Sequence, residues 1–205
     1  GITWVQQTVT VTKTFYSIVW TGDRYYCVGE GGTILTSVDG LTWTSITVST
    51  TSTLYKIIWN GTVCIAVGEG GVILECGSDG KWRVISNGGC IPLTSISSND
   101  STVVAVGGMG LVVTSTDGHS WTEHNVGTTD LLLDGIWDGS RFIATGAQGA
   151  IFDSTNGVSW NRKSVSTTAD LNAIAYSGSE YYIVCGQGTV LKSSNGSSWT
   201  EYVAD

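Results

Sequence analysis

The seven residues Ser115-Thr116-Asp117-Gly118-His119-Ser120-Trp121 form a pattern that recurs along the chain. The same order of serine, Asp or Asn, glycine and tryptophan is found at 37–43, 154–160 and 193–199, and a version at 78–82 has its aspartate shifted by one position. An Asp or Asn side chain at such a place accepts hydrogen bonds from backbone N–H groups two residues on, and the glycine supplies a left-handed conformation. We therefore predict a tight turn at each copy and call it a box turn.

The box turns are one part of a longer repeat. Six tryptophans are spaced by 39 residues, and they are Trp4, Trp43, Trp82, Trp121, Trp160 and Trp199. Glycines at 32, 71, 110, 149 and 188 and apolar residues at 34, 73, 112, 151 and 190 keep the same register. Several independent series in one register indicate five tandem units, which we predict to form a single domain over residues 1–205.

Each unit is predicted to hold four short strands. In the first unit these are 15–20, 25–29, 33–37 and 43–48, and the turn Glu30-Gly31-Gly32 between the second and third provides the glycines that hairpins need. Thr, Val, Ile, Tyr and Trp, which favour strands, are abundant. Four antiparallel strands repeated in tandem predict an all-β protein, a β-propeller with five blades of 39 residues.

Composition excludes several partners and cofactors. The formal net charge is −8 and only 13% of residues are charged, which argues against nucleic acid as a partner. No apolar run is long enough to span a membrane, so no membrane insertion is expected. The five cysteines cannot all pair, although Cys76 and Cys90 could, and no cysteine or histidine spacing forms a metal site. We expect no metal and no cofactor.

The two ends of the chain raise the question of ring closure. Residues 1–4 match the second half of a box turn, so the chain begins with a fourth strand and also ends with one at 199–203. If the N-terminal strand docks beside the last blade, the chain is a closed monomeric ring without free sheet edges, and this is the arrangement we expect. The alternative is an arc that belongs to a longer array or is completed by another copy, so an oligomer could form through the extra terminal strand.

A second aromatic series points to binding sites. Trp20, Trp59, Trp137 and Tyr176 share one position of the repeat, and the third unit has Ser98 there. These rings either fill the space between blades or form a platform on which sugar rings stack. The second interpretation predicts ligand sites between blades at Trp20, Trp59, Trp137 and Tyr176, with the site of the third unit missing.

The box turn resembles the Asp-box (BNR) repeat, in which a Ser-x-Asp-x-Gly-x-Thr-Trp hairpin joins the third and fourth strands of a blade. The wider unit, with Val28-Gly29-x-x-Gly32-x-Ile34 before the box, is similar to Ycf48/HCF136-like propellers and to non-catalytic sialidase-like propellers of bacteria and phages. The resemblance implies a propeller with structural box residues, which here are Asp39, Asp79, Asp117, Asn156 and Asn195. Sialidases need a triad of arginines, and Arg24, Arg83, Arg141 and Arg162 do not converge by the logic of the repeat.

We therefore predict that the protein is not an enzyme and has no catalytic residues. The favoured function is a binding module that recognises glycans or a receptor protein through repeated sites between blades, on an extracellular or virion surface. The alternative is a scaffold for protein assembly or a virion component, and a glycosidase is a remote third hypothesis. A low content of charge and a high content of Ser, Thr and Gly suit such surfaces by analogy alone.

Overall fold

The structure is a computed structural model that describes residues 11–77, 79–86 and 89–203, and these residues form five antiparallel sheets of four strands. We number the sheets blade 1 to blade 5 along the chain. Blade 1 contains β1 (Phe15–Trp20), β2 (Tyr25–Gly29), β3 (Ile34–Ser37) and β4 (Thr44–Ile46). Blade 2 contains β5 (Leu54–Trp59), β6 (Cys64–Gly68), β7 (Ile73–Cys76) and β8 (Trp82–Ser86). Blade 3 contains β9 (Leu93–Ser98), β10 (Val103–Gly107), β11 (Leu111–Ser115) and β12 (Thr122–Asn125). Blade 4 contains β13 (Leu132–Trp137), β14 (Phe142–Gly146), β15 (Ile151–Ser154) and β16 (Asn161–Arg162). Blade 5 contains β17 (Leu171–Tyr176), β18 (Tyr181–Cys185), β19 (Thr189–Ser193) and β20 (Thr200–Val203).

The predicted fold class is confirmed. Strands follow one another in chain order within every sheet, as expected when short turns join neighbouring strands. Within the described ranges the helical content is limited to three-residue 3-10 turns between the second and third strands, such as Glu30–Gly32. None of the helices in that part of the chain is long and apolar enough to cross a membrane.

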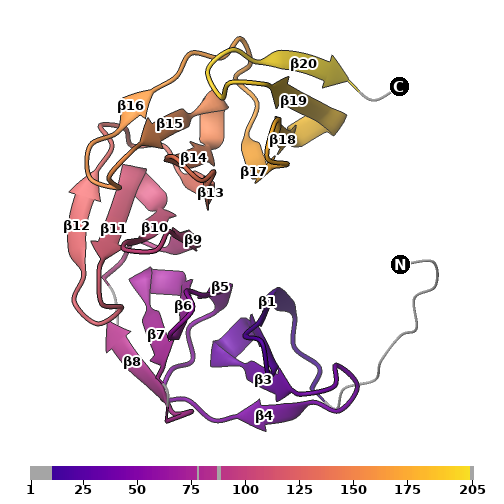
Figure 1. The fold of residues 1–205 in the computed structure, drawn as a ribbon, viewed down its shortest axis with the longest axis vertical. Coiled ribbons are helices and arrows are strands. Elements are labelled where there is room, and N and C mark those ends of the chain that lie inside the picture. The colour runs from indigo at the N-terminus through magenta and orange to yellow at the C-terminus, as the bar shows by residue number, and fades with distance from the viewer. Residues whose placement is uncertain (1–10, 78, 87–88, 204–205) are drawn as a thin grey trace.

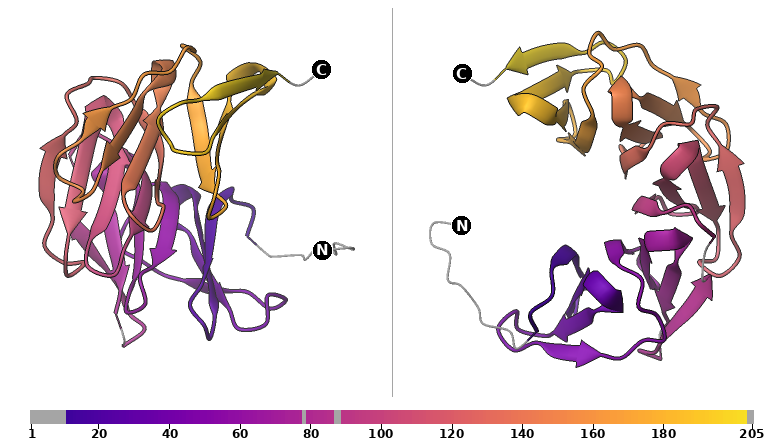
Figure 2. Two further views of the ribbon diagram at one scale, coloured as in Figure 1. Left: turned by 45° about the horizontal axis from the view of Figure 1, so that its top comes forward. Right: turned by 180° about the vertical axis from the view of Figure 1, so that it is seen from behind.

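The blades stand side by side around an arc (Figure 1). The first strand of each blade lies at the inside of the arc and the fourth strand lies at its outer rim, as the views in Figures 1 and 2 show. The second and third strands lie between them and carry most of the buried apolar residues. Each blade therefore presents two broad faces, one to the preceding blade and one to the next.

The core of the molecule lies between blades. Residues of blade 1 such as Tyr26 and Val28 form one buried cluster with Ile57 and Leu74 of blade 2. Three further clusters join blades 2 and 3, blades 3 and 4, and blades 4 and 5 in the same way. A sheet of four strands buries both faces only when it stands between two others, so stability depends on this stacking.

The expected closed ring is not formed by the described residues. No buried cluster in this part of the chain joins blade 5 to blade 1, and the two blades lie on opposite sides of an opening in the arc (Figures 1 and 2). The side chains between neighbouring blades separate one blade from the next, and the four steps from blade 1 to blade 5 leave these two blades apart. Trp4 and the predicted N-terminal strand lie outside the described residues.

The cysteines are unlinked. All five thiols are free, with Cys76 buried in β7 and Cys90 exposed, so the pairing that the sequence left open is not present. Burial raises the pKa of Cys27 to about 11 and that of Cys64 to about 12, which keeps these thiols protonated at neutral pH.

Candidate functional site

The four aromatic residues that the sequence singles out end the inner strands of their blades. Trp59, Trp137 and Tyr176 are half-buried and pack against the clusters between their own blade and the preceding one. Trp20 is 45% exposed, because no blade precedes it among the described residues. Three of the four rings also contact a second aromatic ring of the same blade. The centroid distances are 4.4 Å for Trp20–Tyr25, 4.7 Å for Trp137–Phe142 and 4.4 Å for Tyr176–Tyr181. The three residues that have a preceding blade therefore help to fill the space between blades.

One residue of this series lines a cavity. Trp59 contributes to a pocket of about 430 Å³ between blades 1 and 2, together with Asp23, Arg24 and Tyr26. Arg24 is held at the rim by Asp23, with Nε 3.1 Å from the carboxylate. The pocket thus combines a partly covered indole with one exposed ion pair.

The box turns use their Asp and Asn side chains to close themselves. The Oδ1 atom of Asp117 accepts hydrogen bonds from the backbone N–H groups of His119 at 2.8 Å and Ser120 at 2.7 Å and from the Ser115 hydroxyl at 3.0 Å. Asn156 accepts the equivalent bonds from Val158 and Ser159, both at 2.9 Å. Asp39 and Asn195 do the same in their blades.

These bonds stabilise the ionised carboxylates. Backbone N–H donors lower the pKa of Asp39 to about 2 and hold that of Asp117 well below its usual range. In the shifted second copy, the Arg83 guanidinium and the Lys81 N–H lower the pKa of Asp79 to about 2. The carboxylates of the box residues are therefore engaged by donors of their own turns or, for Asp79, also by Arg83.

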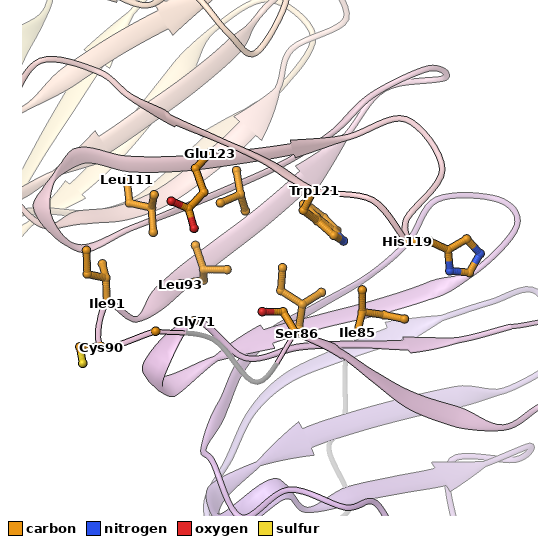
Figure 3. A pocket seen from close by; sticks show the side chains of 13 residues that line it. Gly71, Ile85, Ser86, Cys90, Ile91, Leu93, Leu111, His119, Trp121 and Glu123 are labelled. Carbon is orange, nitrogen blue, oxygen red and sulfur yellow. The ribbon is translucent and has the colours of Figure 1, made fainter.

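A recess that involves several apolar groups lies between blades 2 and 3. It is a cavity of about 550 Å³, and Figure 3 shows Ile85 and Ser86 of blade 2 facing Leu111, Trp121 and Glu123 of blade 3. A wider recess continues from it along blade 3, shares Ile91, Leu111 and Glu123, and reaches Met109 and Asn125. We call these two connected recesses the inter-blade groove.

An irregularity in blade 2 shapes one wall of the groove. In the pairing of β7 with β8, Leu74 is opposite Val84 but Ile73 is opposite Ser86, so Ile85 is an extra residue in the outer strand. A β-bulge of this kind bends a strand and redirects the side chain next to it. Blade 1 has no such shift, because Ile34 is opposite Ile46. The sequence signal was the irregular second box at 78–82, but it did not specify which side chain would move.

The groove is apolar with an acidic wall. Glu123 is exposed on β12, and no lysine or arginine is among the residues that line either recess. At one end, His119 Nδ1 lies 2.5 Å from Oε2 of Glu75, a carboxylate that is 2% exposed. At the other end, Asn125 donates to the Met109 carbonyl oxygen at 2.7 Å. A ligand with apolar and positively charged groups would match this lining.

Polar groups at the inside of the arc tie inner strands to one another. The Asp134 carboxylate on β13 accepts from the Ser95 hydroxyl at 2.7 Å and from the Ile174 N–H at 3.1 Å, and the Lys56 ammonium lies 3.6 Å away. Asp138 has different partners, the Tyr181 hydroxyl and Arg141. Asp134 and Asp138 therefore do not build one site, and the described residues contain no group of three His, Cys, Asp or Glu that could hold a metal ion.

The arginines are paired separately. Arg24 contacts Asp23, Arg83 contacts Asp79, and Arg162 lies 3.9 Å from Asp130. Arg141 contacts Asp138 and Asp153 and donates to the Asn195 carbonyl oxygen at 2.6 Å, which joins blade 4 to blade 5. Each guanidinium is thus neutralised in its own place, and no three converge on a substrate carboxylate.

Comparison with known structures supports the fold. The chain is similar to Ycf48 bound to a D1 peptide, with a TM-score of 0.76 and 22% identity over 98% of this chain and 71% of that one. It is also similar to Ycf48 from Cyanidioschyzon merolae, with a TM-score of 0.74 and 16% identity over 97% of this chain and 74% of the other. The WD40 β-propeller domain of Doa1 matches with a TM-score of 0.71 and 13% identity over 94% of this chain and 69% of that domain. No protein-family model matches the chain, and no curated protein matches it in sequence. At these identities the likeness establishes a β-propeller fold.

Proposed function

We propose that the chain is a non-enzymatic binding module that holds an extended segment of a partner protein in the inter-blade groove. The observation that carries this proposal is the cavity of about 550 Å³ lined by Ile85, Leu111 and Trp121 with Glu123 beside them. A recess with apolar walls and a few polar groups at its edge is the usual form of a binding site. A structure with a similar fold contains a bound D1 peptide, which supports a peptide as the kind of ligand.

The outer strand of blade 3 favours an extended ligand. β12 is the last strand in its sheet, so one edge of Thr122–Asn125 has no strand beside it within that sheet. An extended peptide can pair with such an edge through its backbone while alternate side chains enter the neighbouring recess. The acidic Glu123 would then select a Lys or Arg on the peptide, and Leu111 and Met109 would contact apolar side chains.

The pocket at Trp59 supports a second candidate, the recognition of glycans between blades 1 and 2. An indole beside the Asp23–Arg24 pair could stack on a sugar and bond its hydroxyl groups. The repeated sugar platform at Trp20, Trp137 and Tyr176 receives less support, because a neighbouring ring of the same blade covers part of each of these side chains. Location on an extracellular or virion surface stays a prediction.

A peptide library displayed on phage and selected on the immobilised protein tests the proposal. We expect wild type to enrich peptides that combine apolar residues with Lys or Arg. Glu123→Lys should weaken a selected peptide by about tenfold, which is ~1.4 kcal/mol. The matched control is Glu201→Lys, because Glu201 occupies the same repeat position on β20 and is also exposed. Met109→Asp should act like Glu123→Lys, because Met109 is 55% exposed and can be changed without disturbing the core.

Two outcomes would contradict the peptide site. One is the absence of any enriched peptide, and the other is equal loss of binding in Glu123→Lys and Glu201→Lys. A glycan array probed with wild type and with Trp59→Ala tests the second candidate. Glycan binding that disappears in a folded Trp59→Ala protein would support the pocket between blades 1 and 2 instead.

A further inference from the structure

The repeat allows each residue to be compared with its equivalents in other blades, and this comparison identifies an unpartnered face on blade 1. Ile18 on β1 is 56% exposed, whereas Ile57, Ile96 and Ile174 at the same repeat position are 3%, 2% and 6% exposed. Trp20 lies on the same side of β1 and is 45% exposed. Tyr16 lies at a β-bulge, and its ring contacts Tyr55 of blade 2, so it does not belong to this side. We call Ile18 and Trp20 the front face. Its residues are of the type that other blades bury against a preceding blade.

Blade 5 has the complementary face. Val184 on β18 is 48% exposed, whereas Val28, Val67 and Val106 at the same repeat position are at most 2% exposed. Tyr182 is 37% exposed, whereas its equivalents Tyr26, Ile65, Val104 and Ile143 are buried. We call Tyr182 and Val184 the rear face. Inside the arc, residues at these positions pack against the next blade.

The contact between a rear face and a front face occurs four times within the chain. Between blades 1 and 2, Tyr26 and Val28 of the rear side pack with Ile57 of the front side in one buried cluster. The Ser17 hydroxyl accepts a hydrogen bond from the Ile57 N–H at 3.3 Å, which sets the two inner strands in register. The other three clusters repeat the arrangement. The four contacts within the chain therefore show how a rear face and a front face pack together, and the front face of blade 1 and the rear face of blade 5 carry the same types of residue.

Box turns contribute to the same contact. A Cβ added at Gly157 in the box turn of blade 4 would lie 2.8 Å from Val104 on the rear side of blade 3. A Cβ at Gly118 of blade 3 would likewise lie 3.4 Å from Ile65 of blade 2. The equivalent Gly40 of blade 1 has only Tyr25 of its own blade within 4 Å. The front side of blade 1 therefore also offers a box turn that no rear face covers.

We propose that the front face of one copy of this chain binds the rear face of a second copy, in the same way that consecutive blades bind within the chain. The charged groups beside the rear face do not oppose this contact, because Lys192 and Glu180 already neutralise each other at 2.8 Å. Each contact uses two different surfaces, so it is head-to-tail and leaves a free face at each end. Further copies can add to those free faces.

Two single variants test the proposal. Ile18→Asp removes the front face and Val184→Asp removes the rear face, and both residues are exposed in a single copy, so neither change disturbs its core. By light scattering after size-exclusion chromatography, wild type should exceed the mass of one 21.6 kDa chain, increasingly so at higher concentration. Each variant alone should be a monomer, because every contact needs one front face and one rear face.

Mixing the two variants gives the sharpest result. Ile18→Asp retains a rear face and Val184→Asp retains a front face, so the mixture should form a complex of one copy of each and nothing larger. This heterodimer also demonstrates that both variants are folded. A second pair, Trp20→Glu and Tyr182→Glu, repeats the test with different side chains, because Trp20 is 45% and Tyr182 37% exposed. Wild type that stays monomeric, or mixtures of both pairs that fail to dimerise, would overturn the proposal, as would single variants that still associate.

Discussion

At the residue scale, the box turns have the same hydrogen-bond geometry whether the residue at their centre is a charged Asp or a neutral Asn. Asp117 and Asn156 accept the same two backbone bonds with one side-chain oxygen, at distances that agree to within 0.2 Å. This equivalence was predictable from the sequence, because Asp and Asn alternate at one repeat position. The sequence did not predict how far the tryptophans would be buried, and those after the described box turns are half-buried.

The aspartates of the box turns should make the free energy of unfolding depend on pH. The pKa of Asp39 is lowered to about 2 in the folded protein, and that of Asp117 is lowered further from the same reference of 3.8. Their stabilisation is therefore present above about pH 4 and is lost as pH falls through the folded values. Asp39→Asn with Asp117→Asn should keep stability at neutral pH and reduce the loss between about pH 4 and pH 2.

Urea titrations across this range measure the effect, and Asn156→Asp is the reciprocal control. That change should add a dependence on acid that wild-type blade 4 does not have at this turn. A double Asn variant that loses stability as steeply as wild type would contradict the assignment of the pKa shifts to the box turns.

Trp121 and Trp82 occupy the same repeat position but differ in the hydrogen bond of the indole N–H. Trp121 Nε1 donates to the Gly118 carbonyl oxygen at 3.0 Å, whereas Trp82 Nε1 has no partner among the described residues. Trp121→Phe should therefore destabilise the protein by about 1 kcal/mol more than Trp82→Phe. Chemical denaturation of the two variants checks this difference, and equal losses would show that the indole bond is not the cause.

At the element scale, glycines at the ends of the second strands decide how closely the hairpins pack. A Cβ at Gly107 would lie 2.0 Å from the Pro92 carbonyl oxygen, and Gly29, Gly68 and Gly146 meet the equivalent backbone at 2.0–2.3 Å. The sequence showed this series and its exception, Cys185, but it did not reveal the close contact. Strand positions were predictable from alternation and turn residues, whereas the irregular second box at 78–82 did not specify the bulge at Ile85.

Gly107→Ala should therefore be costly. The added methyl group meets backbone atoms of the incoming strand, which cannot rotate away as a side chain could, and we expect a loss of about 3 kcal/mol. Gly127→Ala is the control, because Gly127 has a positive φ of 85° but nothing within 4 Å of an added Cβ. It should lose only about 1 kcal/mol. Thermal unfolding of both variants would contradict this explanation if the two losses were equal.

At the scale of the whole molecule, the sequence determines which faces match but not how far each blade is rotated from the last. The 39-residue register predicted five blades and their order, and both are confirmed. The rotation depends on the total volume of the side chains between two sheets, such as Tyr26 and Ile57. This total cannot be inferred from any single position of the sequence. The same limit applies to the inter-blade groove, since it results from the fit of blades 2 and 3 rather than from a motif.

The described blades form an open arc in which the front face of blade 1 is exposed. Carbene labelling read by mass spectrometry tests it most directly, because it compares Ile18 with Ile57 and Ile96 at one repeat position in one molecule. Wild type is labelled at a concentration low enough to keep it monomeric, so that a second copy does not cover the front face. The open arc predicts strong labelling of Ile18 and protection of Ile57 and Ile96, in keeping with exposures of 56%, 3% and 2%. Equal protection of all three residues would show that blade 1 is covered by blade 5 in a closed ring and would contradict the account.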